Sequence, residues 1–272
     1  MNLYLQRALI GAVINLILAL GAYRKRAVTP SGGITGLLLG TCIYLAGGLF
    51  FWVHLGAFFF SSTLLGRIRT RTKSEAAEIH AKDGRRDGIQ VLSNIGPATT
   101  AAIIYLAYPH PAWAVAYAAS FAAANADTWA GEIGMLASRE PSSILTGKSL
   151  NPGTSGAVTA LGFGASFLGS LLIGVIFGIG YVLYEGFTVP ALFRTAVVVV
   201  CGFLGSVLDS FLGAVIQAGY RCAVTGGFTE KPVTQGRPNI LIKGVACITN
   251  DTVNLISVTA ITLLAAFTSL AI

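Results

Sequence analysis

The chain has 272 residues, of which 54% are hydrophobic and 11% charged, and it carries a formal net charge of +7. Apolar runs long enough to cross a bilayer recur along it, and because they are continuous they exclude a membrane β-barrel, whose strands alternate apolar and polar residues. The four cysteines are scattered without a CxxC pair, so neither a zinc site nor a disulfide framework is indicated. We predict an all-α fold, a polytopic helical membrane protein.

Eight membrane-spanning helices are predicted, although a count of seven stays open because only Gly47-Gly48 separates the second helix from the third. The chain is interpreted as a single integral membrane domain over residues 1–272, with loops at about 23–31, 67–88, 138–155 and 219–242. The predicted helices are residues 3–22, 32–48, 49–66, 89–108, 112–137, 156–184, 190–218 and 243–270.

The basic residues are distributed asymmetrically under the eight-helix count. Segments 23–31, 67–88, 138–155 and 219–243 hold 3, 7, 2 and 4 of the 18 Lys and Arg residues. The positive-inside rule therefore predicts that this side, including Lys82, Lys148 and Lys231, is cytoplasmic and that both termini lie outside. The first apolar run is followed by its basic cluster, which is the wrong flank for a signal peptide and predicts a retained helix.

Acidic and amide residues interrupt the apolar runs. The segment Asn125-Ala-Asp-Thr-Trp-Ala-Gly-Glu132 closes the fifth run. An Asp at the bilayer centre costs about 2.5–3.5 kcal/mol and usually has a functional role, although a carboxylate bound to a neighbouring helix is the structural alternative. At 1.5 Å per residue, Asp127, Asp209, Asp251 and Asn94 are all expected roughly 10–15 Å below the basic helix ends.

Several of these helices carry polar stripes, because residues three or four apart share one helix face. Asp127 and Glu132 are five apart, about 140° around an ideal helix, so they face one site only if Gly131 loosens the turn. The stripes are Asp87, Gln90 and Asn94, then Asp209, Gly213 and Gln217, then Asn250 and Asn254.

Four carboxylates at one level repel each other unless they are protonated or bridged by cations. Mg²⁺, held by one or two carboxylates and substrate phosphates, fits this set and would suit phosphoryl transfer. The segment Lys148–Gly156 could cradle a phosphate at the start of a helix, although a helix-capping turn explains it equally well. Basic residues would complete a mouth suited to anions: Arg85, Arg86, Lys231, Arg237 and Lys243.

Five segments resemble the membrane family that contains phytyl-phosphate kinase of the tocopherol pathway, and the resemblance covers roughly residues 30–260. It implies an enzyme of isoprenoid metabolism that transfers a phosphoryl group from a nucleoside triphosphate, CTP or ATP, to a prenyl monophosphate lipid. Neither a P-loop nor a protein-kinase signature is present. The segments are residues 84–94, 126–132, 151–156, 205–217 and 250–254.

The resemblance also implies roles for individual residues. Mg²⁺ and the donor phosphates would be held by Asp127, Glu132, Asp209 and Asp251. The expected partners are a prenyl-phosphate lipid, the nucleotide and the bilayer, with no nucleic acid. A lipid-phosphate nucleotidyltransferase and an ion-coupled transporter of a small anion remain alternatives. Substrate and nucleotide contacts would come from Asn94, Gln90, Arg86, Lys148, Gly153, Thr154, Ser155, Gly156, Gln217, Asn250 and Asn254.

Overall fold

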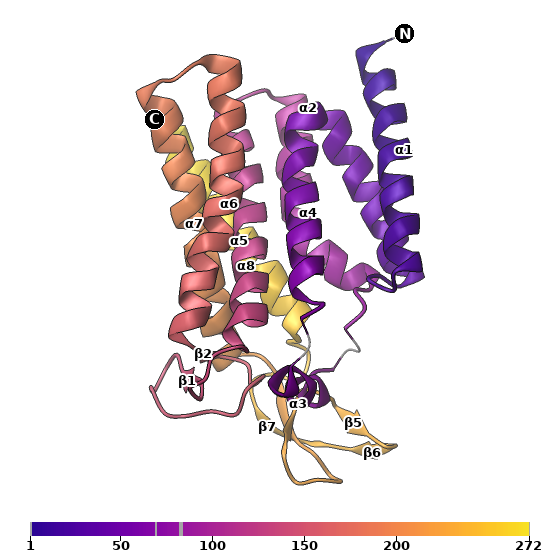
Figure 1. The fold of residues 1–272 in the computed structure, drawn as a ribbon, viewed down its shortest axis with the longest axis vertical. Helices are drawn as coiled ribbons and strands as arrows, with labels where there is room; N and C mark the ends of the chain where they lie inside the picture. Colours follow the sequence, from indigo (N-terminus) through magenta and orange to yellow (C-terminus); the bar gives the residue numbers. More distant parts are fainter. Residues whose placement is uncertain (1, 69, 82–83, 272) are drawn as a thin grey trace.

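A computed structural model describes residues 2–68, 70–81 and 84–271 and confirms a polytopic helical membrane protein (Figure 1). Within that part of the chain, six helices are long and apolar enough to cross a membrane. The helices are α1 (Leu3–Arg24), α2 (Pro30–Leu65), α3 (Arg71–Ile79), α4 (Gly88–Ala107), α5 (Pro111–Gly134), α6 (Ala160–Glu185), α7 (Val189–Val215) and α8 (Asn250–Leu270).

Helix α2 folds back on itself at Gly48. The backbone there has φ 60° and ψ −146°, a conformation that glycine adopts readily and L-residues do not. Both ends of α2 reach the same residue: the N–H of Thr29 donates to the Arg86 carbonyl at 3.0 Å, and Arg86 Nη1 donates to Ser62 Oγ at 3.1 Å. The two arms of this 36-residue helix therefore run in opposite directions, which favours eight crossings over seven.

The spanning helices begin at polar side chains that accept hydrogen bonds from the first free backbone N–H groups. Thr159 caps α6, and Thr249 caps α8. At α4 the cap is a reciprocal capping box, in which Asp87 Oδ1 accepts from the Gln90 N–H at 2.9 Å and Gln90 Oε1 accepts from the Asp87 N–H at 3.1 Å. Two members of one predicted polar stripe thus have a capping role.

The sixth helix begins at Ala160 and not at residue 156, so Gly156 lies outside it. Two predicted boundaries at the connection between α7 and α8 are also wrong. The last helix begins at Asn250 and not at Lys243, so Asp251 lies in its first turn instead of eight residues inside it. Helix α7 ends at Val215, so Gln217 lies beyond the helix and not on its face. Both differences arise because the connection between α7 and α8 folds as β-structure.

In the part of the chain that the structure describes, seven short strands and α3 cap one end of the bundle (Figure 1). They pair antiparallel as β1-β2, β4-β3-β7 and β5-β6, with Tyr220 opposite Leu241 in the largest sheet. They were not predicted, because strands of two to four residues are too short to show an alternating pattern. The strands are β1 (Ser142–Ser143), β2 (Ala157–Val158), β3 (Gly219–Arg221), β4 (Phe228–Thr229), β5 (Val233–Thr234), β6 (Arg237–Pro238) and β7 (Ile240–Lys243).

Helix α5 lies at the centre and packs against α2, α4, α6, α7 and α8. Every residue from Ala114 to Ala126 is buried, and most are alanines that let neighbouring helices approach closely. Asn125 is tied on two sides, accepting from Ser61 Oγ at 2.9 Å and donating to the Gly169 carbonyl at 2.8 Å. The polar residue that opens the central motif therefore holds three helices together.

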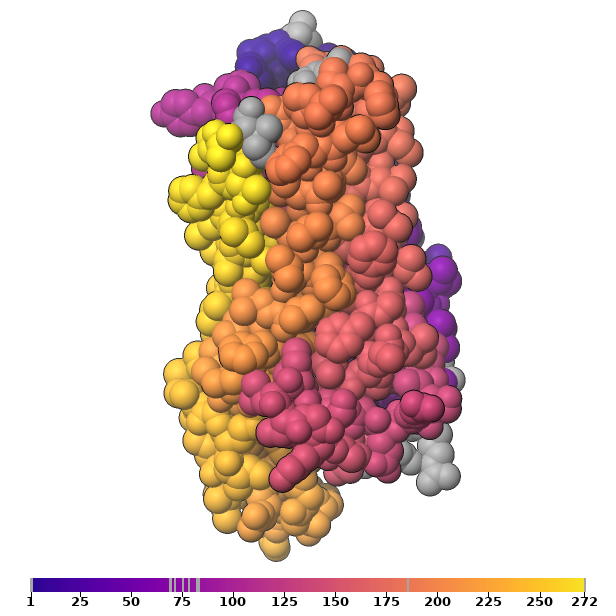
Figure 2. All heavy atoms as spheres, turned by 90° about the vertical axis from the view of Figure 1, so that its left-hand side faces the viewer, coloured from indigo at the N-terminus to yellow at the C-terminus, as the bar shows by residue number. Residues whose placement is uncertain are grey.

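The outer surface of the bundle is apolar, as a lipid-facing surface should be. Figure 2 shows α6, α7 and α8 side by side on one face, with the connecting loops below them. Large side chains on these helices are exposed, among them Phe167, Val200 and Phe267. A bilayer would cover this surface and leave the strand end in water.

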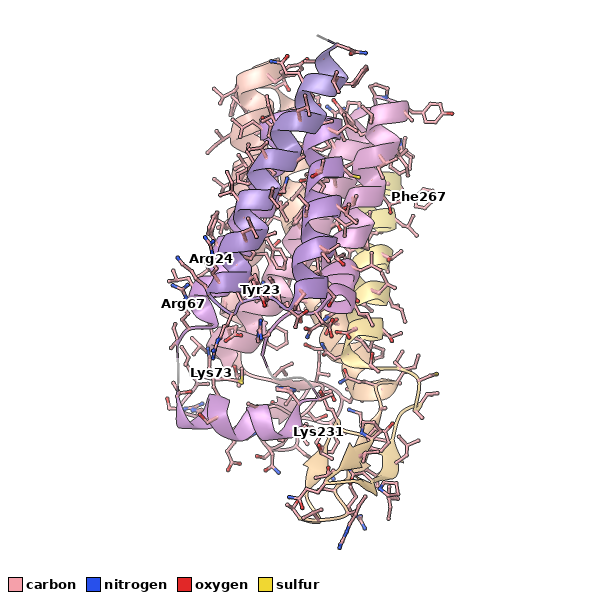
Figure 3. All side chains as sticks on the ribbon, turned by 90° about the vertical axis from the view of Figure 1, so that its right-hand side faces the viewer. Tyr23, Arg24, Arg67, Lys73, Lys231 and Phe267 are labelled. Atoms are coloured by element: carbon pink, nitrogen blue, oxygen red, sulfur yellow. The ribbon has the colours of Figure 1, made fainter. Side chains whose placement is uncertain are left out.

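Both termini lie at the end of the bundle opposite the strands (Figure 1). Arg24, Arg67, Lys73 and Lys231 all lie toward the strand end of the molecule (Figure 3). The segregation of basic residues inferred from the sequence is thus present in three dimensions, and the cytoplasmic location of this end stays a prediction. Lys82 lies outside the described residues.

We predict that the strand end is cytoplasmic. In a chain whose native cysteines are replaced by serine, Lys148→Cys places a thiol on an exposed loop of that end, and Phe187→Cys places one on the α6–α7 turn, where Phe187 is 75% exposed. In intact cells, an impermeant maleimide should label Phe187→Cys and leave Lys148→Cys unlabelled until the cells are lysed. The reverse pattern would contradict the orientation.

Candidate functional site

A cavity of about 220 Å³ lies between α5, α6, α7 and the loops of the strand end. Asp127 reaches it from α5 and Asp209 from α7, while Asn250 lines it from the start of α8. The turn Gly153–Gly156 and Gln217 complete its wall on the loop side. Residues from four predicted segments, distant in the chain, are thereby brought to one cavity.

Asp127 and Asp209 form a carboxylate pair in this cavity. Asp209 is only 9% exposed, and its Oδ2 accepts from Ser257 Oγ of α8 at 2.9 Å, while Asp127 lines the same cavity. Two carboxylates that share a site away from water repel each other, so they require a proton or a cation. The pair is therefore a candidate cation site.

The turn 153–156 depends on its glycines. Gly153 and Gly156 both have φ of 84°, in the left-handed region. A Cβ on Gly153 would lie 2.7 Å from the Cβ of Ala76 in α3, so that only glycine allows α3 to approach this closely. Lys243 Nζ donates to the Ser155 carbonyl at 3.0 Å and fixes the turn to β7. The predicted phosphate-binding turn thus adjoins the carboxylate pair.

Two buried hydroxyls beside the cavity lack protein partners. Ser155 Oγ and Ser166 Oγ have no hydrogen-bond partner among the described residues, and both residues line the cavity. Ser166 is 1% exposed. Leaving a buried polar group unpaired costs about 1–3 kcal/mol, which a polar ligand would relieve.

The donor set at this cavity fits Mg²⁺ that is shared with a ligand. Mg²⁺ is usually bound by one or two carboxylates together with water and substrate phosphates. Asp127 and Asp209 supply that number of carboxylates. Among the residues that the structure describes, no three Asp, Glu, His or Cys side chains converge as a metal cage. The geometry therefore suits a metal that arrives with phosphate.

Glu132 and Asp251 do not line this cavity. Glu132 Oε2 lies 2.5 Å from Lys73 Nζ, which also donates to the Leu65 carbonyl at 3.1 Å. Glu132 thus contacts α3 while Asp127 lines the cavity, as expected if the two residues lie about 140° apart on the helix. Asp251 and Asn254 are buried on α8 outside the cavity wall. The structure brings two of the four predicted carboxylates together.

The remaining predicted contacts are divided between a second cavity and the surface. Arg86, Gln90 and Asn94 line a cavity of about 90 Å³ between α1, α2 and α4. Asn94 Nδ2 donates to the Gln90 carbonyl at 2.8 Å. Lys148 is exposed in the β1–β2 connection and does not line either cavity.

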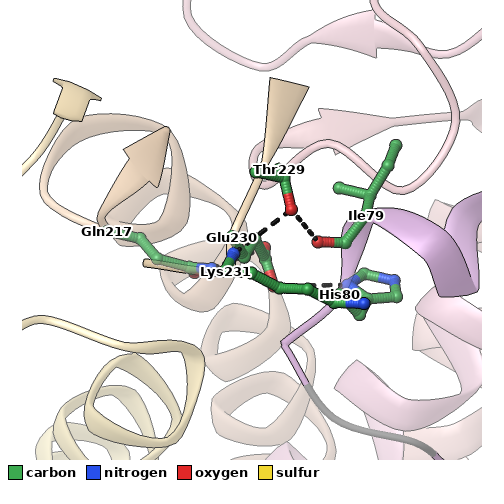
Figure 4. A network of polar contacts seen from close by, with 6 residues as sticks. All are labelled: Ile79, His80, Gln217, Thr229, Glu230 and Lys231. Atoms are coloured by element: carbon green, nitrogen blue, oxygen red, sulfur yellow. Dashed lines mark hydrogen bonds and ion pairs between the residues drawn. The ribbon is translucent and has the colours of Figure 1, made fainter. Parts of the chain in front are cut away.

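Sequence reasoning missed Glu230, which joins three elements beside the first cavity (Figure 4). Gln217 Nε2 donates to Glu230 Oε1 at 2.7 Å, and His80 Nδ1 lies 3.3 Å from Glu230 Oε2. Thr229 Oγ1 donates to the Ile79 carbonyl at 3.1 Å. No sequence signal marks Glu230, because its partners come from the segment after α3 and from the end of α7.

Comparison with known proteins identifies the family. The model of the family described as "Integral membrane protein DUF92" matches residues 13–262. The chain belongs to this family. It is 29% identical to Protein PGR of Arabidopsis thaliana over 276 residues, with 93% of this chain and 92% of that protein covered. The resemblance that the motifs carry is confirmed at the level of the family.

Relatives also occur outside plants. An uncharacterized membrane protein of Synechocystis sp. is 31% identical over 211 residues, covering 75% of this chain and 78% of that protein. An uncharacterized membrane protein of Methanocaldococcus jannaschii is 29% identical over 213 residues, covering 78% and 84%. No solved structure matches the chain.

The contact between His80 and Glu230 predicts a pH dependence of stability. The hydrogen bond and charge of Glu230 raise the pKa of His80 above its usual 6.5, against the opposing effects of desolvation and Lys231. Because the pKa of His80 is higher in the folded state, the interaction of its protonated imidazole with Glu230 stabilises the fold fully below about pH 6.5. This contribution to the free energy of unfolding is lost as the pH rises through the folded-state pKa. The free energy of unfolding of the wild type should therefore fall by up to about 1 kcal/mol between pH 6 and pH 8 through this pair.

Thermal unfolding of the purified protein at several pH values checks this. His80→Gln should flatten the curve between pH 6 and pH 8, whereas Arg24→Gln, an exposed substitution at the same end, should leave it unchanged. An unaltered slope in the His80 variant would show that this pair does not link folding to protonation.

Proposed function

We propose that the chain is a phosphotransferase of the prenyl-phosphate kinase type, which uses a nucleoside triphosphate, CTP or ATP, to phosphorylate a lipid monophosphate. The observation that carries the proposal is the convergence of Asp127, Asp209 and the Gly153–Gly156 turn on one cavity at the strand end of the bundle. Carboxylates that can share a metal and a turn suited to phosphate are the parts that phosphoryl transfer requires.

In the proposed reaction an oxygen of the lipid phosphate attacks the terminal phosphorus of the nucleotide. A new P–O bond forms, and the bond from that phosphorus to the oxygen bridging to the β-phosphate breaks. The products are a lipid diphosphate and a nucleoside diphosphate. Because the transferred group needs little covalent help, the protein contributes mainly by positioning and charge stabilisation.

The cavity residues have separate roles in this proposal. Asp127 and Asp209 would hold Mg²⁺, which neutralises negative charge on the donor phosphates when bound. The 153–156 turn would bind a phosphate through its backbone, and Ser166 would donate its unpaired hydroxyl. Glu132 would affect the cavity only indirectly, because its contact with Lys73 holds α5 against α3.

The position of the cavity suits two substrates of opposite polarity. The nucleotide would enter from the strand end, which we propose is cytoplasmic, where the loops carry most of the basic residues. The lipid would remain in hydrocarbon and present only its phosphate at the end of the bundle. A separate soluble nucleotide-binding domain is then unnecessary.

We predict that Asp127→Asn and Asp209→Asn each reduce turnover to less than about a tenth of wild type, a loss above about 1.4 kcal/mol in transition-state stabilisation. Each change removes a negative charge that would bind the metal while keeping the size of the side chain. Turnover is measured with purified protein, Mg²⁺, CTP or ATP, and a panel of prenyl phosphates. Glu140→Gln, an exposed loop carboxylate outside the cavity wall, is the matched control and should retain full activity. Retention of most activity in either Asp variant would remove that residue from the metal site.

The nature of the products separates this proposal from its alternatives. A kinase should release nucleoside diphosphate only when Mg²⁺ and lipid phosphate are both present, and mass spectrometry should detect the lipid diphosphate. Release of pyrophosphate with a nucleotidyl lipid would instead identify a nucleotidyltransferase. Gradient-driven anion uptake into sealed vesicles, with no nucleotide chemistry, would refute both enzyme readings.

A further inference from the structure

The second cavity differs in character from the first. Its wall is mostly apolar and comes from α1, both arms of α2 and α4, with Leu18, Leu55 and Phe59 among its residues. One cationic side chain, Arg86, enters it at the end nearer the strands. An apolar cavity with a single charged group suits an amphiphile, whose apolar part and charged head would contact these two parts of the wall.

Arg86 is half-buried and lacks a carboxylate partner among the described residues. Its Nη1 donates to Ser62 Oγ at 3.1 Å, and its Cζ lies 5.6 Å from the centroid of the Phe58 ring. Glu132, whose charge acts on Arg86, is already bound by Lys73 at 2.5 Å. Burial lowers the pKa of Arg86 from its usual value. A guanidinium in this setting would be stabilised by an anion, because the nearest carboxylate is shared with Lys73 and a buried charge is costly unless it is fully paired.

A second donor lies beside the guanidinium. Gln90 uses its Oε1 in the α4 capping box, and the capping box does not involve its Nε2 donor. Arg86 and Gln90 both line the cavity, so they present N–H groups toward the same space. Guanidinium groups bind phosphate oxygens through paired, charge-assisted hydrogen bonds.

The apolar part of the cavity contains room that a lipid chain could enter. A Cβ added to Gly36, in the first arm of α2, would meet no atom within 4 Å. Helix α1, which forms the opposite wall, buries only Gly11, Asn15 and Ala22 among its described residues. A cavity of about 90 Å³ accommodates a phosphate and the first carbons of a chain, so the rest of the chain would lie in the bilayer.

The two cavities meet at consecutive residues of α5. Asp127 lines the first cavity and Thr128 lines the second. The two cavities therefore border the same turn of α5.

We infer that the cavity between α1, α2 and α4 is the site of the acceptor lipid, with its phosphate bound by Arg86 and Gln90 and its chain beginning against Gly36. This inference rests on the proposed function and deepens it, since it assigns the lipid to the cavity on the Thr128 side of α5 and the nucleotide to the cavity on the Asp127 side. The two phosphates would have to meet at this turn of α5 for transfer. Arg86, Gln90 and Asn94 then belong to the lipid side of the enzyme and not to the nucleotide side.

Equilibrium binding in the absence of nucleotide tests the inference. The full chain in phosphatidylcholine nanodiscs is titrated with radiolabelled geranylgeranyl monophosphate. Arg86→Gln should weaken binding at least about tenfold by removing the charge. Gly36→Leu should weaken it to a similar extent by filling the cavity without disturbing α2, so it remains informative if Arg86→Gln fails to fold.

Two controls match these variants. Arg24→Gln removes an exposed cation from the same end of the bundle (Figure 3), and Gly164→Leu adds the same side chain at an exposed glycine of α6 that also has open space. Both should bind the lipid as the wild type does. Binding of CTP with Mg²⁺ should be unchanged in Arg86→Gln and Gly36→Leu.

The outcomes distinguish this inference from the proposed function. Wild-type lipid binding by both Arg86→Gln and Gly36→Leu would overturn the inference even if the wild-type protein is a kinase. Lipid binding that depends on Arg86 and Gly36, in a protein that transfers no phosphoryl group, would support the site and refute the kinase. Displacement of the probe by phosphatidic acid as effectively as by unlabelled prenyl phosphate would identify a general phospholipid headgroup site and overturn the assignment to an acceptor.

Discussion

The burial of α5 on all sides is the constraint on which the rest of the structure depends. A membrane helix can be surrounded by five neighbours only if its side chains are small, and its run of alanines meets that condition. Glycines on the partner helices complete the close contact, as at Gly205, where an added Cβ would collide with Ala123. Polar groups at the end of such a helix cannot reach lipid, so they must find partners on neighbouring helices or in a ligand.

This constraint explains how one short motif contributes to several functions. Asn125 ties α5 to α2 and α6 through hydrogen bonds, Asp127 faces α7, and Glu132 contacts Lys73 after α2. Each successive residue is rotated by about 100° around the helix. A central helix therefore distributes its polar residues to different neighbours, and a motif that is continuous in the sequence becomes a set of separate contacts in the fold.

Sequence reasoning predicted the fold class, the asymmetry of basic residues and the convergence of Asp127 with Asp209, because hydropathy and depth along a helix are local properties. It could not predict which neighbouring element each polar residue of α5 contacts. Glu132 was therefore grouped with Asp127. Asp251 was placed too deep because the short strand β7 resembles the start of an apolar helix. Glu230 was invisible, since its role arises only where β4 ends beside the segment after α3.

The basic loops are more than an orientation signal. Lys73 neutralises Glu132, and Lys243 donates to the Ser155 carbonyl and so fixes the glycine turn against β7. Ala76 of α3 packs against Gly153, and His80 contacts Glu230, so the segment that carries Lys73 also lines the first cavity. These charged residues therefore also form structure around the cavity. Loop substitutions at Lys73 or Lys243 are thus expected to act on the site through the geometry of α3 and the turn, and not only through topology.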